Sequence, residues 1–199
     1  MTEREVDEGK RATLKRFAAL GATTPLVRLS ANENSEVRGA IVGYLAATPG
    51  AHFSKLRDDL QLGTGEAQHH LRRLTDDGAV EHRMDGEYKR YFPADRFSAF
   101  EQRALGYLRR ETPGTMLITL LRDPSASGQE IAAAADVSRS TVSKHAAELE
   151  SAGLLSRADG YSVEHPETLL ILVVRYADSF GADAVELADE ADALIGYGH

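Results

Sequence analysis

The stretch VSRSTVSKHAAELESAGLL, residues Val137–Leu155, decides the fold of this chain. Its apolar residues recur at the three- and four-residue intervals of one side of a helix, at Val142, Ala146 and Leu149. Ser138 is a residue type that caps helix N-termini, and Gly153 is a residue type that ends helices. The stretch therefore predicts a helix over Ser138–Ser151 with one buried side, one polar side and a tight turn after it.

The same order of features occurs earlier in the chain. A shift of 75 positions lays residues 37–80 on residues 112–155 without a gap. The identical residues fall at structural positions, pairing Leu45 with Leu120, Pro49 with Pro124, His70 with His145, Leu74 with Leu149 and Gly78 with Gly153. Each copy continues into a hairpin signal that turns on Asp-Gly, at residues 85–86 and 159–160. Two helices joined by a short turn and followed by a β-ribbon are typical of a winged helix-turn-helix domain.

We predict a mainly α-helical chain with small β-wings, built from two tandem winged helix-turn-helix domains and a C-terminal helix. The first domain is predicted over residues 36–95 and the second over residues 112–165, with a connecting helix over residues 96–111. Residues 1–35 are predicted to be disordered or to form a short helix. Residues 166–199 are predicted to form an acidic, amphipathic helix.

The composition limits the classes of function. The 199 residues carry a net charge of −8 and include no cysteine, which excludes disulfides and Cys-ligated zinc. No apolar run approaches the roughly 20 residues that cross a bilayer, and the charged N-terminus is unlike a signal peptide, so we expect no membrane partner and a cytoplasmic location. A net charge of −6 lies in residues 166–199 alone. An acidic surplus with few lysines also suits concentrated salt and indicates a halophilic source.

The stretch Val137–Leu155 resembles the recognition helix and following turn of the ArsR- and MarR-like winged-helix regulators. The resemblance lies in the Ser cap, the Thr-Val-Ser segment, the basic residue and His, and the Ala-Gly-Leu turn before the wing. Tandem domains followed by an apolar helix in an acidic chain are similar to a group of haloarchaeal transcriptional regulators. The resemblance implies double-stranded DNA as the partner, a role in transcription regulation and an archaeal source. The thiolates of metal-sensing ArsR members are absent, which argues against a metal sensor.

The polar side of the predicted helix over Ser138–Ser151 supplies the first candidate DNA contacts. An Arg can donate two hydrogen bonds to guanine, and small Ser side chains permit close approach to the major groove. A Lys and a His farther along the helix are expected to touch the phosphate backbone. The predicted contacts from this helix are Arg139, Ser140, Ser143, Lys144 and His145.

The first copy supplies a second set of candidates by the same geometry. The outward side of its last helix is predicted to hold Thr64, Gln68, His69, Arg72 and Arg73, of which Gln68 is suited to adenine. Its hairpin is the more basic of the two, and we predict phosphate contacts from Arg83, Lys89 and Arg90. The second hairpin offers only Arg157 and is predicted to be structural.

Catalytic and metal chemistry have little support in the sequence. His69 and His70 are adjacent, so a helix points them about 100° apart and they are not placed to bind one ion together, and the chain has no cysteine to complete a site. No nucleophile elbow, glycine-rich phosphate loop or paired acid motif occurs. We therefore predict no enzyme activity, no metal and no cofactor.

The C-terminal segment is apolar on all sides around residues 169–174, which predicts cover from more than one direction. We predict a homodimer with this segment at its interface, and as the alternative we consider packing back between the two domains of the same chain. The predicted dimerisation residues are Leu169, Leu172, Val173, Tyr176, Phe180, Leu187 and Leu194. The alternative function is that of a non-catalytic tandem winged-helix scaffold for protein interaction, as in chromosome-condensation complexes.

Overall fold

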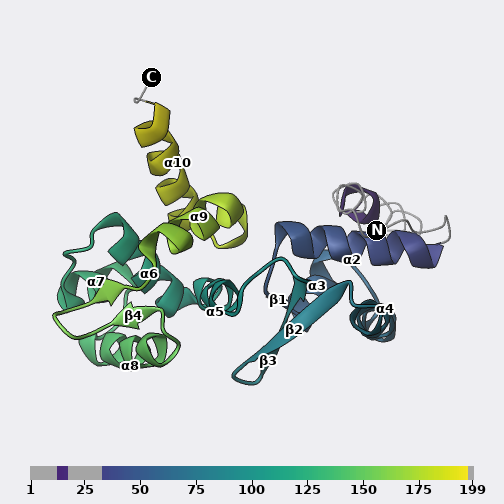
Figure 1. Cartoon of the computed structure of the whole chain (residues 1–199), viewed down its shortest axis with the longest axis horizontal. Helices are drawn as coiled ribbons and strands as arrows, with labels where there is room; N and C mark the ends of the chain where they lie inside the picture. The colour runs from purple at the N-terminus through teal and green to yellow at the C-terminus, as the bar shows by residue number, and fades with distance from the viewer. Residues whose placement is uncertain (1–12, 18–32, 197–199) are drawn as a thin grey trace. The chain divides into compact units, whose positions relative to one another are not determined.

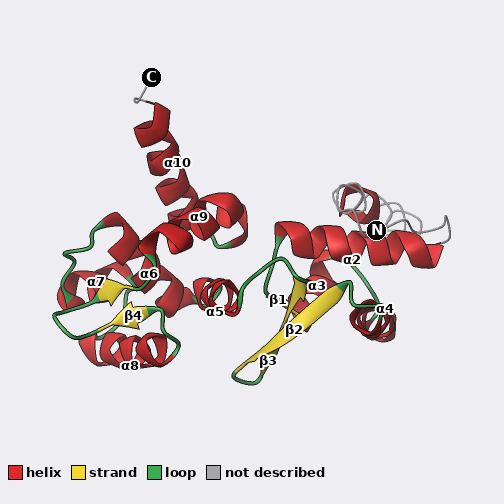
Figure 2. Cartoon of the chain, in the orientation of Figure 1, coloured by secondary structure: helices red, strands yellow, loops and turns green. Residues whose placement is uncertain are grey.

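The structure, a computed structural model, describes residues 13–17 and 33–196. The chain divides into two compact units, Met1–Ser98 and Ala99–His199. The predicted fold class is confirmed, because both units are mainly helical and each adds one small antiparallel sheet (Figure 2).

Unit 1 is a winged helix-turn-helix domain. Its helices are α2 (Glu33–Ala47), α3 (Phe53–Asp59) and α4 (Thr64–Asp76). Its strands are β1 (Ala51–His52), β2 (Val80–Asp85) and β3 (Tyr88–Pro93), in the sheet order β1-β3-β2 with both pairings antiparallel. Figure 1 shows the β2–β3 hairpin extending beyond the helices of its own unit.

The helices of unit 1 enclose an apolar core. Ile41 and Leu45 of α2 and Leu56 of α3 are fully buried. The helical residues 13–17 add to this core, since Leu14 is buried and the Phe17 ring packs edge-on against Tyr44 at 5.3 Å between centroids. Within the predicted N-terminal segment, residues 13–17 are therefore helical and residues 33–35 begin α2, while the others lie outside the described residues.

Unit 2 contains the second winged helix-turn-helix domain together with helices on both sides of it in the sequence. It begins with α5 (Ala99–Leu108), and the domain itself comprises α6 (Glu111–Arg122), α7 (Gly128–Ala134), α8 (Arg139–Ser151), β4 (Leu155–Ser156) and β5 (Ser162–Val163). It ends with α9 (Pro166–Tyr176), a 3-10 turn η1 (Ala177–Ser179) and α10 (Ala182–Gly196).

The predicted connecting helix is part of unit 2. α5 packs against α6 and α9 and ends at Leu108, so it is shorter than predicted. The turn into α6 is tight, because a Cβ on Gly114 would lie 2.7 Å from the backbone oxygen of Leu108. Glycine is therefore needed at this close approach.

The sequence repeat is reproduced in the backbone. Shifting α3 and α4 by 75 positions gives the bounds of α7 and α8. The turns agree as well: Gly78 and Gly153 have φ of +70° and +69°, and Gln61 and Asp136 have φ of +54° and +48°. The wings differ, since the strands of the second hairpin are only two residues long.

The C-terminal segment departs from the prediction of one continuous helix. The backbone breaks between α9 and α10, where Gly181 takes φ of +111°. Within unit 2, α9 packs against α5 and α10, and α10 also packs against α6.

The burial of this segment corrects the predicted dimerisation residues. Five of the predicted side chains are buried within unit 2 itself, namely Leu169, Leu172, Val173, Tyr176 and Leu187. Phe180 is half-buried beneath the Arg109 guanidinium, 5.0 Å from its ring centroid, and the Leu194 side chain lies outside the described side chains. The buried residues belong to the core of unit 2, because α5 and α10 pack against the apolar sides of α9 for which a second subunit was predicted as cover.

Candidate nucleic-acid interface

The N-terminal turn of α8 is held by its own hydroxyl groups. The Ser138 Oγ accepts a hydrogen bond from the Thr141 backbone N–H at 3.2 Å, as the predicted cap requires. It also lies 2.7 Å from the Ser140 Oγ and 2.9 Å from the Thr141 Oγ1. This cluster of hydroxyl groups stabilises the N-terminus of α8, where Arg139, the first exposed cation of the helix, is located.

The two sides of α8 divide as the sequence predicts. Val142, Ala146 and Leu149 are fully buried. The opposite side is exposed and carries Arg139, Ser140, Ser143 and Lys144. Four of the five predicted contact residues of this helix therefore lie together on one accessible surface.

His145 lies elsewhere. Its side chain is 17% exposed, and its Nδ1 lies 3.2 Å from the Glu148 Oε2, which also accepts a hydrogen bond from the Arg110 Nη2 at 2.8 Å. Partial burial opposes ionisation of Glu148, but the hydrogen bonds from His145 and Arg110 outweigh it and lower the pKa of this carboxyl group. His145 thus belongs to a network in which Glu148 links α8 to Arg110, and its half-buried side chain lies apart from the exposed residues with which it was predicted to contact DNA.

A second arginine holds the other end of α8. The Arg103 Nε of α5 donates a hydrogen bond to the backbone oxygen of Ala152, the residue that caps the C-terminus of α8, at 2.9 Å. A cation at this end also suits the helix dipole. Arg103 and Arg110 are not among the residues predicted from the sequence, although their spacing of seven residues is a helical same-side signal.

The predicted contact residues of α4 lie on its exposed side, as those of α8 do. Thr64, Gln68, His69, Arg72 and Arg73 are all exposed. The cap differs from that of α8: Gly63 has no side chain to offer, and its backbone N–H donates to the Glu66 carboxylate at 3.2 Å. The Arg72 Nε lies 3.9 Å from the Asp76 carboxylate, a long and exposed ion pair that leaves the guanidinium accessible.

The adjacent histidines of α4 have different environments. His69 is exposed, whereas His70 is 5% exposed and its Nδ1 has no hydrogen-bond partner among the described residues. Burial lowers the pKa of His70, and the neighbouring His69 lowers it further. Among the described residues no three His, Asp or Glu side chains gather as a metal site would require.

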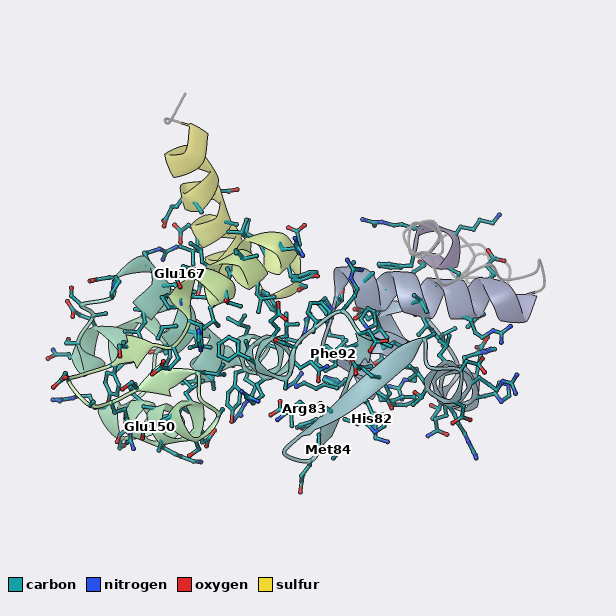
Figure 3. All side chains as sticks on the ribbon, viewed as in Figure 1. His82, Arg83, Met84, Phe92, Glu150 and Glu167 are labelled. Carbon is teal, nitrogen blue, oxygen red and sulfur yellow. The ribbon has the colours of Figure 1, made fainter. Side chains whose placement is uncertain are left out.

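The three cations that were predicted as phosphate contacts in the first wing differ in their exposure and in their partners. Lys89 is exposed and pairs across the hairpin with Met84, and Arg83 is half-buried. Figure 3 labels Arg83 and Met84 on this hairpin. Arg90 is 6% exposed, and its Nε donates to the Asp85 Oδ2 at 2.5 Å while its Nη1 donates to the Gly50 backbone oxygen at 3.1 Å. Arg90 therefore joins the hairpin to the domain and is not placed to meet a phosphate, which corrects its assignment.

The arginine of the second wing is also paired within the chain. The Arg157 Nε donates to the Glu150 carboxylate of α8 at 2.8 Å, and this hydrogen bond lowers the pKa of Glu150. Arg157 therefore links the second wing to the C-terminal turn of α8.

In the described ranges, 13–17 and 33–196, no helix has both the length and the apolar content needed to span a membrane.

Comparisons with known proteins agree with this architecture. Residues 35–105 match a family model described as an N-terminal helix-turn-helix domain. Residues 109–156 match a family model described as winged helix-turn-helix, DNA-binding. A search of curated proteins gives no match. With the two wings that the structure shows, this chain is a tandem winged helix-turn-helix protein.

Proposed function

We propose that this protein is a sequence-specific, DNA-binding transcription regulator that acts in the cytoplasm and has no catalytic activity. The observation that carries the proposal is the exposed side of α8, where Arg139, Ser143 and Lys144 stand together. Arg103 and Arg110 hydrogen-bond to the C-cap and to Glu148 of this helix, which holds α8 against unit 2 with its cationic side exposed.

The charges of α8 favour an anionic partner despite the acidity of the whole chain. Its two acids are neutralised within unit 2, Glu148 by Arg110 and Glu150 by Arg157. Arg139 and Lys144 have no ion-pair partner in the described part of the chain. The exposed side of α8 is therefore locally cationic near the helix N-terminus, the end that favours phosphate groups.

The chemistry of these side chains assigns them different roles. Arg139 is suited to the O6 and N7 atoms of guanine, which reads sequence. Lys144 is suited to a phosphate, which positions the helix without specifying bases. Ser140 and Ser143 are small enough for the groove to approach closely.

Unit 1 supplies the second contact surface of the proposal. By the 75-residue shift, Thr64, Gln68 and His69 of α4 correspond to Arg139, Ser143 and Lys144 of α8. Arg72 and Arg73 add two exposed cations on the next turn of α4. Arg83 and Lys89 of the first wing would bind phosphates of the DNA backbone.

We further propose that the regulator acts as a homodimer. A two-fold protein presents its recognition helices to the two halves of a palindromic site. The dimer would use side chains other than those already buried in the core of unit 2.

The test begins with selection of bound fragments from a genomic library by the full-length protein, followed by titration of the selected duplex. Arg139→Ala should weaken binding by about 1–3 kcal/mol and relax the preference at one base pair. Lys144→Ala should weaken binding to all sequences alike and lower the salt slope by about one unit.

Arg96→Ala is the matched control, since it removes one exposed arginine from a loop outside both recognition helices and the wing. Equal affinity for wild type, R139A and K144A would overturn the assignment of α8. Failure to enrich any DNA, with capture of a defined protein in its place, would favour the scaffold function.

A further inference from the structure

α9 carries a line of exposed residues on the side opposite its buried ones. Glu167, Ile171 and Arg175 are exposed and four residues apart, so they follow one another along the helix surface. Ile171 is 59% exposed, which is unusual for a large apolar side chain in the described part of the protein. We call these three residues the α9 stripe; Figure 3 labels Glu167 at the start of this helix.

The α9 stripe is complementary to itself. Ile171 stands at its centre, with an acid one turn before it and a base one turn after it. If a second α9 is turned by 180° about an axis through Ile171, Glu167 meets the partner's Arg175 at both ends and the two isoleucines meet in the middle. A two-fold interface requires this reciprocal pairing.

The charges around the α9 stripe also favour a second copy of this chain as the partner that binds there. Neither Glu167 nor Arg175 has an ion-pair partner within the described part of the chain. On α10, Glu186 and Glu190 are paired with Arg122 of α6, while Asp183 and Asp189 are exposed acids that disfavour docking of a second copy there at low salt. The neighbouring Leu170 and Val174 are half-buried and add apolar surface beside Ile171.

We propose that a second copy of this chain docks on the α9 stripe, with the two α9 helices antiparallel and Ile171 at the two-fold axis. This inference deepens the homodimer of the proposed function and rests on it. It assigns the interface to the exposed side of α9, whereas the buried side holds unit 2 together.

The test measures the molar mass of the full-length protein without DNA, by sedimentation equilibrium over a range of concentrations. Wild type should be a dimer at micromolar concentrations. Ile171→Glu should raise the dimer dissociation constant at least about tenfold, because it places two carboxylates against each other at the axis. Ile171→Leu should keep the dimer.

A charge swap tests the register. Glu167→Arg and Arg175→Glu should each weaken the dimer about tenfold, since each places like charges opposite one another twice. The double variant E167R/R175E should return to within about threefold of wild type. Glu87→Arg, the same change of charge in the first wing, is the control and should leave the mass unchanged.

Thermal unfolding of each variant serves as the second measurement, because Glu167 and Arg175 also suit the dipole of α9. A weaker dimer with an unchanged melting temperature supports the proposal. A wild-type monomer, a dimer that tolerates I171E, or a double variant as weak as the single ones would overturn it. A dimer that binds no DNA would contradict the proposed function and leave this inference standing.

Discussion

Arg83 and Arg90 are paired across the first hairpin, yet Arg90 is buried and bonded within the domain whereas Arg83 is partly exposed. Arg90 is bonded to Asp85 and to the Gly50 backbone oxygen, whereas Arg83 has no ion-pair partner among the described residues. The sequence predicts both as phosphate contacts, because both are basic residues of the same hairpin. The alternation of residues along a strand does not reveal which parts of the domain pack against each side chain. Gly50 is 40 residues away from Arg90, and only the folded sheet brings them together.

Replacing Arg90 by Ala should lower the stability of unit 1 by about 3 kcal/mol, because it leaves a largely buried carboxylate without its cation. Arg83→Ala should change stability by less than about 0.5 kcal/mol while lowering the salt slope of DNA binding by about one unit. Chemical unfolding and salt titration of the two variants check this. The interpretation fails if R90A unfolds at the wild-type denaturant concentration.

His145 shows the same limit of residue-scale prediction. Helical geometry places it between the buried and exposed sides, so the sequence leaves its direction open. The pairing with Glu148, itself held by Arg110, turns the imidazole inward. The other predicted residues of α8 are exposed as expected, because their direction follows from the apolar spacing alone.

The two recognition helices differ at their N-termini. α8 has the Ser138 cap, while the corresponding turn of α4 contains Gly63 and Gly65. A Cβ on Gly65 would meet no atom within 4 Å, so the fold of this chain does not require glycine there. A glycine that packing does not require is suited to the close approach of a ligand backbone.

Gly65→Ala should therefore stabilise unit 1 by about 0.5–1 kcal/mol and yet weaken DNA binding. Opposite changes in these two quantities separate the folding role of the position from its binding role. Thermal unfolding and DNA titration of the same preparation measure them. Unchanged affinity would remove the first turn of α4 from the proposed interface.

His70 makes the packing of α4 depend on pH. Because burial lowers the pKa of the folded imidazole from 6.5, the unfolded chain takes up a proton more readily. The contribution of His70 to stability is therefore complete above pH 6.5 and is lost as the pH falls through the lower folded pKa. Glu66 opposes this shift, and Arg38 adds to it.

His70→Leu should abolish this loss of stability, and at neutral pH it should be neutral or stabilising because the Nδ1 atom has no partner to lose. His69→Gln, an exposed change on the same helix, should reduce this loss without abolishing it, because burial is the larger cause of the shift in the His70 pKa. Denaturation measured across the acidic range decides between them. A wild-type unfolding midpoint that is flat with pH would contradict this account of His70.

At the scale of the whole molecule, the internal repeat explains the presence of two domains of the same fold. The gap-free shift between the two copies predicts both helix-turn-helix domains, because the residues that repeat are the ones that end helices and fill cores. The C-terminal segment was harder to predict. Its apolar residues have the same pattern whether they meet a second subunit or their own domain, and only the folded α5 and α10 show which side is covered.

Deleting residues 166–199 should unfold unit 2 and leave unit 1 intact. The deletion removes Leu169 and Val173 from the core, and each such side chain contributes about 1.5–3 kcal/mol. Calorimetry should show the loss of one transition, with the transition of unit 1 retained. A soluble truncated chain with both transitions would show that α9 is an appendage to unit 2.

The proposed function requires the exposed side of α8 to lie in a groove of double-stranded DNA. The chain has no cysteine, so Ser143→Cys introduces a single thiol to which an iron chelate can be attached for cleavage of the selected duplex. If α8 lies in the groove, strand cuts should be confined to a few adjacent nucleotides of the bound site, and a chelate at Asp189→Cys on α10 should give none. Uniform cutting from both positions, or no cutting from S143C under conditions where the protein binds the duplex, would contradict it.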